Sequence, residues 1–199
     1  MIILGLTGSI AMGKSATANI FSSYGVPVFD ADLCVHQLMG FNGRLVPLIA
    51  KEFPSTLEKK KNYRFINRAK LGNIVFNNKK LKRNLENIIH PQIGRERKKW
   101  TEQAIRRRDK IICYDIPLLF ETKVEKAVDE IIVVSAPYFI QRQRALKRKN
   151  MDLKKLNNIL KTQMPDKDKR KRANFVVNTG NGHRFSRNQV KNIIEKLSK

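Results

Sequence analysis

The chain has 199 residues, of which 41% are hydrophobic and 29% are charged, a balance typical of one globular domain and not of a disordered chain. Lysine and arginine number 41 against 17 acidic residues, and the formal net charge of +24 favours anionic ligands. No apolar run reaches the roughly 18 residues that span a bilayer. The two cysteines, Cys34 and Cys113, fit no metal-binding spacing and lie in apolar runs, which predicts reduced, buried thiols in a cytoplasmic protein.

Short runs of valine, isoleucine and leucine alternate with helical patterns along the chain. The apolar runs predict five strands, at 1–8, 26–32, 110–119, 129–137 and 173–180. Helices are expected at 14–25, over a lysine-rich region from about 45 to 108, over 138–171 and at 186–197, and His90-Pro91 is typical of a helix terminus. Continuous apolar strands separated by helices indicate an α/β fold, with a five-stranded parallel sheet covered by helices on both faces.

The segment "GLTGSIAMGKSA" carries the pattern of a phosphate-binding loop, with Gly8, Gly13, Lys14 and Ser15 at the required spacing. The glycines allow consecutive backbone N–H groups to point at one anion, and the following helix adds its positive dipole end. Lys14 is expected to reach the β- and γ-phosphates, and the Ser15 hydroxyl is expected to bind Mg²⁺. The residues predicted to bind ATP here are Gly8, Ala11, Met12, Gly13, Lys14, Ser15 and Ala16.

Two aspartates, Asp30 and Asp32, follow the second predicted strand in "VFDAD". Ligands of open α/β sheets bind at the carboxyl ends of the strands, and an extended backbone directs both side chains to one side. A carboxylate in this position can accept the proton of an attacking hydroxyl. Asp32 is predicted to have the functional role, either accepting this proton or orienting the hydroxyl, whereas Asp30 fits catalysis and the capping of a helix near Leu33 equally well.

A third group of polar residues lies in "QRQRALKRKN". On a helix, Gln141, Arg144 and Arg148 share one face, because they are spaced by three and four residues. An arginine brought to the γ-phosphoryl group stabilises the transition state by about 10³–10⁵ in rate. The sequence therefore predicts a mobile, charged lid whose shared face can bring an arginine to the nucleotide, while Arg142, Lys147 and Lys149 fit a solvated face.

Taken in order, these motifs resemble the dephospho-coenzyme A kinase family from Ile3 to about Leu197. "GLTGSIAMGKS" is similar to the opening loop of the family, and "DADLCVHQLM" to its next segment. Further similar segments are "INRAKLGNIVFNNKKLKRNLENIIHP", "DIPLLFET", "VVSAPYFIQRQRALKR" and "TQMPDKDKRKRANFVVNTG". Apart from the first, each segment is weak alone, but their order and spacing make the resemblance strong.

The resemblance implies ATP-dependent phosphorylation of the ribose 3′-hydroxyl of dephospho-coenzyme A, with Mg²⁺ as the cofactor. It implies a nucleotide-binding core (1–32, 109–137 and 172–199), a helical substrate subdomain (33–108) and a lid (138–171). Asp32 matches the proposed general base, Arg144 the lid arginine and Arg148 a second lid contact with ATP. Asn178 and Gly180 fall where a late loop passes the adenine. The residues expected to contact the acceptor are Thr7, Asp32, His90, Pro117, Leu118, Leu119 and Glu121.

Several residues depart from the family pattern. Ser9 and Ala11 replace loop glycines, and a positive φ angle at Ala11 would cost about 1 kcal/mol or more. Ala16 replaces a common threonine, and Asn174 replaces an aspartate. Because Lys14, Asp32 and Arg144 are retained, an active enzyme is expected.

Two other functions fit parts of the sequence. Another small-molecule or nucleotide kinase would share the loop and the lid, but "NIIHP" and "IPLLFE" favour the coenzyme A family. A nucleic-acid-binding protein would use the +24 charge, but the chain carries no zinc, helix-turn-helix or aromatic RNA-binding pattern. Most of the basic excess therefore indicates solvated faces. The expected partners are ATP and dephospho-coenzyme A, without specific nucleic acid or membrane, in a monomer or weak homo-oligomer.

Overall fold

The computed structural model describes residues 1–76 and 78–198. The chain divides into two compact units, which are described separately below. The first comprises Met1–Phe29 and Ala104–Lys199, and the second comprises Asp30–Gln103. The sequence-based division placed these boundaries near 32/33 and 108/109.

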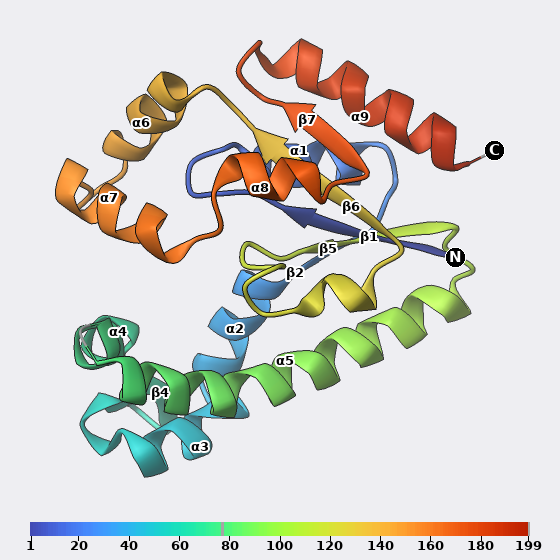
Figure 1. The fold of residues 1–199 in the computed structure, drawn as a ribbon. Helices are drawn as coiled ribbons and strands as arrows, with labels where there is room; N and C mark the ends of the chain where they lie inside the picture. Colours follow the sequence, from blue (N-terminus) through green and yellow to red (C-terminus); the bar gives the residue numbers. More distant parts are fainter. Residues whose placement is uncertain (77, 199) are drawn as a thin grey trace. The chain divides into compact units, whose positions relative to one another are not determined.

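A five-stranded sheet forms the centre of the first unit, in the order β2-β5-β1-β6-β7 (Figure 1). β1 pairs in parallel with β5 and with β6, and β6 pairs in parallel with β7. The strands are β1 (Ile2–Thr7), β2 (Val28–Asp30), β5 (Ile111–Asp115), β6 (Glu130–Ser135) and β7 (Phe175–Asn178). Every residue of β5 is buried, as expected for a strand covered on both faces. The predicted α/β fold with its five-stranded parallel sheet is confirmed.

Helices of the first unit pack against this sheet. α1 contacts β5 and α9, α9 also contacts β7, and α8 contacts β6. The helices are α1 (Lys14–Ser23), α6 (Tyr138–Leu146), α7 (Leu153–Thr162), α8 (Asp166–Lys171), α9 (His183–Leu197) and the short 3₁₀ helix η2 (Val124–Ala127). Leu4, Phe21 and Val134 are among the fully buried side chains of the core between strands and helices. The sheet thereby provides a rigid edge from which the loops after its strands project.

The second unit is mostly helical and has its own apolar core, which includes Leu45, Ile49 and Leu71. Its elements are α2 (Ala31–Met39), α3 (Leu45–Glu52), the 3₁₀ helix η1 (Pro54–Thr56), β3 (Leu57–Lys60), β4 (Tyr63–Ile66), α4 (Arg68–Phe76) and α5 (Lys79–Arg106), which continues past Gln103. β3 and β4 form an antiparallel hairpin where the sequence predicted helix. Contacts with the loop after α2 account for the hairpin, because Phe41 packs on Tyr63 and Phe65, and Asn42 bonds to the backbone of Arg64.

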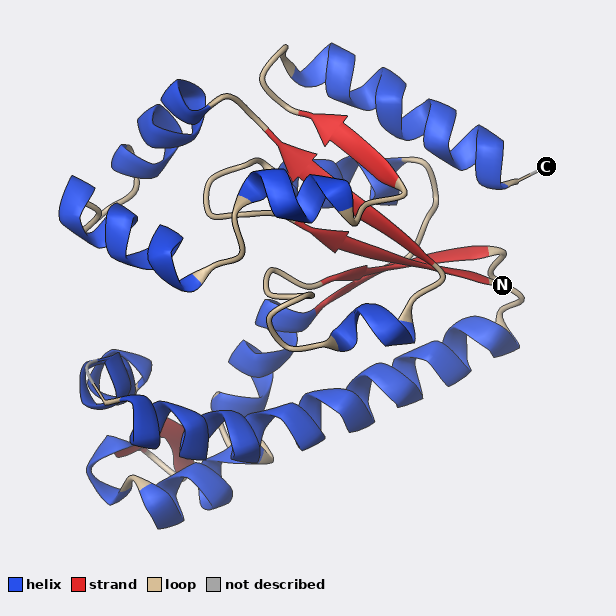
Figure 2. Cartoon of the chain, viewed as in Figure 1, coloured by secondary structure: helices blue, strands red, loops and turns tan. Residues whose placement is uncertain are grey.

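The helix terminus predicted at His90-Pro91 is wrong. α5 continues through Pro91 as one helix of 28 residues (Figure 2). A proline inside a helix removes one N–H donor from the ladder and usually costs about 3 kcal/mol. Pro91 is exposed, so water can hydrogen-bond to a backbone carbonyl that lacks its usual donor. Leu85, Ile88 and Ile89 pack against the core of the second unit and hold the two helical turns that precede Pro91.

Candidate active site

The predicted phosphate loop lies between β1 and α1, as the motif requires. At Gly8, a Cβ atom would lie 2.3 Å from Val134 Cγ2 and 2.8 Å from the Val134 carbonyl oxygen, so no side chain fits. Gly13 is the N-cap of α1 and has a φ angle of 95°, a conformation that L side chains rarely adopt. Both glycines are therefore needed for the path of the backbone, and the N-terminus of α1 opens directly onto the loop.

Ala11, which replaces a loop glycine, has a positive φ angle of 61°. Its left-handed conformation costs about 1–2 kcal/mol. The Ala11 methyl group lies in a small apolar cluster with Ala145 of α6 and Leu156 of α7. Burying one such carbon contributes about 0.8 kcal/mol, which offsets much of the strain. The departure at Ala11 therefore connects the loop to two helices of the predicted lid.

Lys14 forms an ion pair with Asp115, with 2.5 Å between Lys14 Nζ and Asp115 Oδ1. Asp115 ends β5 and is only 2% exposed, so the pair lies in a largely dry environment at the carboxyl edge of the sheet. Sequence reasoning missed Asp115, although its position at the end of the apolar strand "IICYD" satisfies the rule that selected Asp30 and Asp32. Ser15, the next residue along α1, is exposed.

Arg144 of α6 is attached to the phosphate loop through Thr179. Its guanidinium donates to Thr179 Oγ1 at 2.9 Å and to the Thr179 carbonyl oxygen at 2.7 Å. Thr179 Oγ1 in turn donates to the Met12 carbonyl oxygen at 2.6 Å. These hydrogen bonds connect α6 of the predicted lid, the loop after β7 and the phosphate loop. Thr179, like Asp115, was not among the residues predicted from the sequence.

The expectation that Arg148 continues the helical face of Gln141 and Arg144 is wrong. α6 ends at Leu146, and Arg148 lies in the following turn, where its N–H donates to the Ala145 carbonyl oxygen at 3.0 Å. The Arg148 side chain is exposed. Gln141 does lie on α6 and is buried, with its amide donating to the Ile10 carbonyl oxygen at 2.9 Å.

Two residues predicted to contact the acceptor, Thr7 and Leu119, are fully buried, and the structure gives both a structural role. Thr7 Oγ1 donates to the Pro117 carbonyl oxygen at 2.9 Å and fixes the turn after β5 beside the end of β1. Leu119 packs against the backbone at Gly5. Pro117 and Leu118 are only partly buried and keep surface that a ligand can contact.

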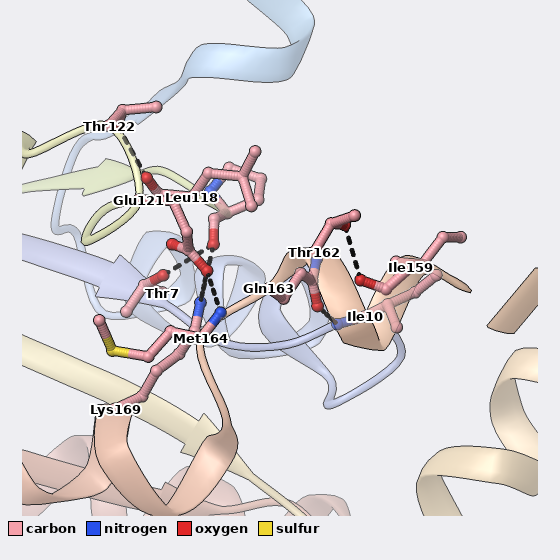
Figure 3. Close-up of polar contacts among 11 residues, drawn as sticks. Thr7, Ile10, Leu118, Glu121, Thr122, Ile159, Thr162, Gln163, Met164 and Lys169 are labelled. Atoms are coloured by element: carbon pink, nitrogen blue, oxygen red, sulfur yellow. Dashed lines mark hydrogen bonds and ion pairs between the residues drawn. The ribbon is translucent and has the colours of Figure 1, made fainter. Parts of the chain in front are cut away.

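Glu121, a predicted acceptor contact, is held by a buried lysine (Figure 3). Its Oε1 lies 2.9 Å from Lys169 Nζ and accepts the Met164 N–H at 2.8 Å. Lys169 of α8 is 0% exposed and also approaches the Pro117 carbonyl oxygen at 3.5 Å. These contacts connect the turn after β5 to the end of the lid. Lys169 lies in one of the many lysine-rich stretches of the chain, so its burial could not be recognised from the sequence.

The loop after β7 is stiffened by its own hydrogen bonds. Asn178 Oδ1 accepts the Gly180 N–H at 2.8 Å, and the Asn178 N–H donates to Gln189 of α9 at 3.0 Å. A Cβ atom at Gly180 would lie 2.8 Å from Pro137, so this position has no room for a side chain. Both residues predicted near the adenine therefore shape this loop.

In the second unit, Asp30 is the N-cap of α2, and its carboxylate accepts the Leu33 N–H at 2.9 Å. Asp32 lies in the first turn of this helix and is exposed. The prediction of one extended backbone for both aspartates is wrong, because α2 begins at Ala31. His90 lies within α5 and is exposed. Capping therefore accounts for Asp30 and leaves the carboxylate of Asp32 accessible.

Both cysteines are buried and unpaired, as the sequence predicted. Burial raises the pKa of the Cys113 thiol, and the neighbouring Asp115 raises it further. In the second unit, burial raises the pKa of Cys34, with smaller contributions from Glu96 and Asp30. Both thiols are therefore neutral and weakly nucleophilic at neutral pH, and neither fits a catalytic nucleophile.

Comparison with known proteins identifies the family to which the chain belongs. A sequence model described as dephospho-CoA kinase matches residues 2–184. A dephospho-CoA kinase from Bartonella quintana is 46% identical over 199 residues, which cover 100% of both chains. The chain belongs to the dephospho-CoA kinase family. Its activity is that of a dephospho-CoA kinase, the final step of coenzyme A biosynthesis.

Solved structures agree with this family in fold. A dephospho-CoA kinase from Campylobacter jejuni matches with a TM-score of 0.71 and 29% identity, covering 98% of this chain and 96% of that one. The protein TT1252 from Thermus thermophilus matches with a TM-score of 0.83 and 27% identity, covering 98% and 97%. The likeness therefore extends over both compact units of the kinase.

The kinase structure also explains the departure at Asn174. Asn174 Oδ1 accepts the Ile131 N–H at 2.8 Å, and the Asn174 N–H donates to the Ile131 carbonyl oxygen at 3.0 Å. The side chain uses its oxygen as an acceptor, a capacity that asparagine and aspartate share. Asn174 thereby retains the hydrogen bond that an aspartate could accept from the Ile131 N–H of β6.

Proposed function

We propose that the kinase transfers the γ-phosphoryl group of ATP to the 3′-hydroxyl of the ribose in dephospho-CoA. The observation that carries the proposal is the phosphate loop, which ends in Lys14 paired with the buried Asp115 at 2.5 Å. The loop fits a phosphate chain because its glycines bring backbone N–H groups and the start of α1 to one place. When ATP binds, its phosphates become additional anionic partners of the Lys14 ammonium, at the carboxyl ends of the strands.

We further propose that Mg²⁺ binds with the nucleotide, next to Ser15 and Asp115. The exposed Ser15 hydroxyl and the Asp115 carboxylate supply the hard oxygen ligands that Mg²⁺ prefers, and Mg²⁺ commonly takes its remaining ligands from phosphates and water. The bound ion would neutralise charge on the β- and γ-phosphates. In this proposal Lys14 orients the terminal phosphate, and Asp115 orients Lys14.

Arg144 is the proposed stabiliser of the transferring phosphoryl group, and Arg148 is a proposed second contact with ATP. Two donors of the Arg144 guanidinium bind Thr179, which itself binds Met12 of the phosphate loop. A guanidinium carries five N–H donors, so the contact with Thr179 leaves donors for a phosphoryl oxygen. Arg148 lies in an exposed turn directly after α6, where its charge is available to a bound nucleotide.

On the acceptor side, Asp32 is the proposed general base for the ribose hydroxyl. Pro117, Leu118, Glu121 and His90 are proposed contacts with dephospho-CoA, and Asn178 and Gly180 are proposed to border the adenine of ATP. Glu121 and the Pro117 carbonyl group fit such a role because Lys169 and Thr7 hold them in fixed positions. Fixed polar groups lose little entropy when a substrate binds.

The site of phosphorylation is tested by mass spectrometry and NMR of the product. Purified kinase, ATP and Mg²⁺ are supplied with dephospho-CoA, AMP, adenosine, shikimate and gluconate together. We expect only dephospho-CoA to gain a phosphoryl group, and we expect the new phosphorus signal to couple to the ribose 3′ proton. Transfer to another acceptor, or to the 2′-hydroxyl group, would refute the proposal.

Replacing Asp32 by asparagine is expected to lower kcat by about a hundredfold without lowering the melting temperature. General bases contribute about 10²–10⁴ in rate, and a loose phosphoryl-transfer transition state requires little deprotonation of the acceptor, which favours the lower end. The matched control is Asp30→Asn, because asparagine caps a helix as well as aspartate does. Equal kinetic losses in the two variants would show that Asp32 has no special role.

The proposal also covers the oligomeric state of the kinase and its location in the cell. Within residues 1–76 and 78–198, no helix is long and apolar enough to cross a membrane. We propose a monomer or weak homo-oligomer in the cytoplasm, where the two neutral, buried thiols stay reduced. Light scattering at several protein concentrations measures the oligomeric state directly.

A further inference from the structure

Two glutamines bind the backbone of the same phosphate-loop residue. Gln141 of α6 donates its side-chain N–H to the Ile10 carbonyl oxygen at 2.9 Å. Gln163, directly after α7, accepts the Ile10 N–H with its Oε1 at 3.0 Å (Figure 3). The chemistry of the backbone fixes both amide orientations, because only an N–H can donate and only a C=O can accept. Ile10 therefore has both of its main-chain polar groups bound by side chains of the lid region.

The neighbouring contacts reinforce this attachment. Ala11 has a φ angle of 61°, and its methyl group packs with Ala145 of α6 and Leu156 of α7. Gln141 is 3% exposed, so an unmet hydrogen bond at its amide would be costly. Met164, next to Gln163, donates its N–H to Glu121. Ile10 is thus held by hydrogen bonds from α6 and from the residue directly after α7, and Ala11 is held by apolar packing against these two helices.

We propose that Gln141 and Gln163 are positioning residues that set the direction of the phosphate-binding N–H groups by holding Ile10. Ile10 precedes the left-handed residue Ala11, and the peptide planes from there to Lys14 lead into the start of α1. A rotation at Ile10 would turn these N–H groups away from the phosphate chain. The inference rests on the proposal that residues 8–15 bind ATP, and it adds that the lid prepares this loop before the chemical step.

The test uses one substitution at two positions with opposite expected results. Gln163→Glu keeps an acceptor for the Ile10 N–H, whereas Gln141→Glu places an ionised oxygen against the Ile10 carbonyl oxygen at about pH 8. Each variant adds one negative charge beside the same residue, so general repulsion of ATP affects both. The apolar references are Gln163→Met and Gln141→Met. Gln143→Glu, on the exposed side of α6, adds the same charge without an Ile10 contact.

We expect the KM for ATP to rise about threefold to tenfold in both methionine variants, the range that corresponds to one lost hydrogen bond. The KM of Gln163→Glu should lie below that of Gln163→Met, and the KM of Gln141→Glu above that of Gln141→Met. The KM for dephospho-CoA should change less than twofold in all variants, and Gln143→Glu should match the unmodified kinase. A glutamine that only stabilises the fold would not give this reversal of order.

Hydrogen exchange of the Ile10 amide, measured without nucleotide, tests the contact independently of ATP. We expect faster exchange in Gln163→Met and retained protection in Gln163→Glu. An equal rise in the KM for ATP within each pair would overturn the positioning role and leave the ATP site intact. Unchanged KM values for ATP, with faster Ile10 exchange in Gln163→Met, would overturn both the positioning role and the assignment of residues 8–15 to ATP.

Discussion

Replacing Arg144 by alanine is expected to lower kcat by about a thousandfold, with a smaller change in the KM for either substrate. Arginines that stabilise a transferring phosphoryl group contribute about 10³–10⁵ in rate, because the charge they bind develops in the transition state. A thousandfold loss corresponds to about 4 kcal/mol. Single-turnover kinetics by rapid quench measure the chemical step separately from product release.

Arg142→Ala is the matched control for Arg144. Arg142 lies on the same helix, and its side chain is exposed. We expect this variant to keep the rate of the unmodified kinase. Arg144→Lys keeps the charge but cannot reproduce the two bonds to Thr179, so an intermediate rate is expected. If the alanine variants at the two positions lose the same rate, the basic surface of α6 acts as a whole, and the specific role of Arg144 is refuted.

Replacing Lys14 by methionine is expected to remove phosphoryl transfer by about a factor of 10²–10³ and to destabilise the fold. The rate falls because a preorganised donor for the transferred group is lost, and one such donor contributes about that factor. The fold is destabilised because the 2%-exposed Asp115 carboxylate loses its ionic partner at 2.5 Å. Breaking a buried pair on one side costs up to about 3–5 kcal/mol. Stopped-time assays and urea unfolding measure the two effects.

The double variant with Lys14→Met and Asp115→Asn separates chemistry from folding. Asparagine is uncharged and close to isosteric with aspartate, so we expect the double variant to regain much of the lost stability. Phosphoryl transfer should stay as low as in Lys14→Met. Recovery of the rate together with the stability would contradict a direct role of Lys14 in the reaction, because the loss in the single variant would then be one of folding.

Local patterns in the sequence determined the phosphate loop and the parallel sheet. The spacing of Gly8, Gly13, Lys14 and Ser15 encodes one strand-to-helix turn, so neighbouring residues suffice to predict it. Runs of apolar residues likewise predicted all five strands of the sheet, because strands covered on both faces need continuous apolar sequence. The position of Arg144 on a helix followed from local spacing as well.

Local patterns failed where distant contacts override propensity. The hairpin β3–β4 depends on Phe41 and on hydrogen bonds with Asn42, and α5 passes through Pro91 while packed on the apolar core of its unit. Arg148 does not lie on the predicted helical face because α6 ends at Leu146, and Asp32 lies in a helix instead of a strand because α2 begins at Ala31. In these places the end of an element is set by its surroundings.

The partners of the candidate site residues were decided by the tertiary structure alone. Lys14 and Asp115 are 101 residues apart in sequence, and Ile10 and Gln163 are 153 apart. Lys169 looks like any other lysine of a highly basic chain until the fold buries it against Glu121. The sequence by itself determined the family, the loop and the sheet, because these depend on neighbouring residues. Only the packed fold decided which charges and amides face that loop, because such contacts form between segments that no local pattern connects.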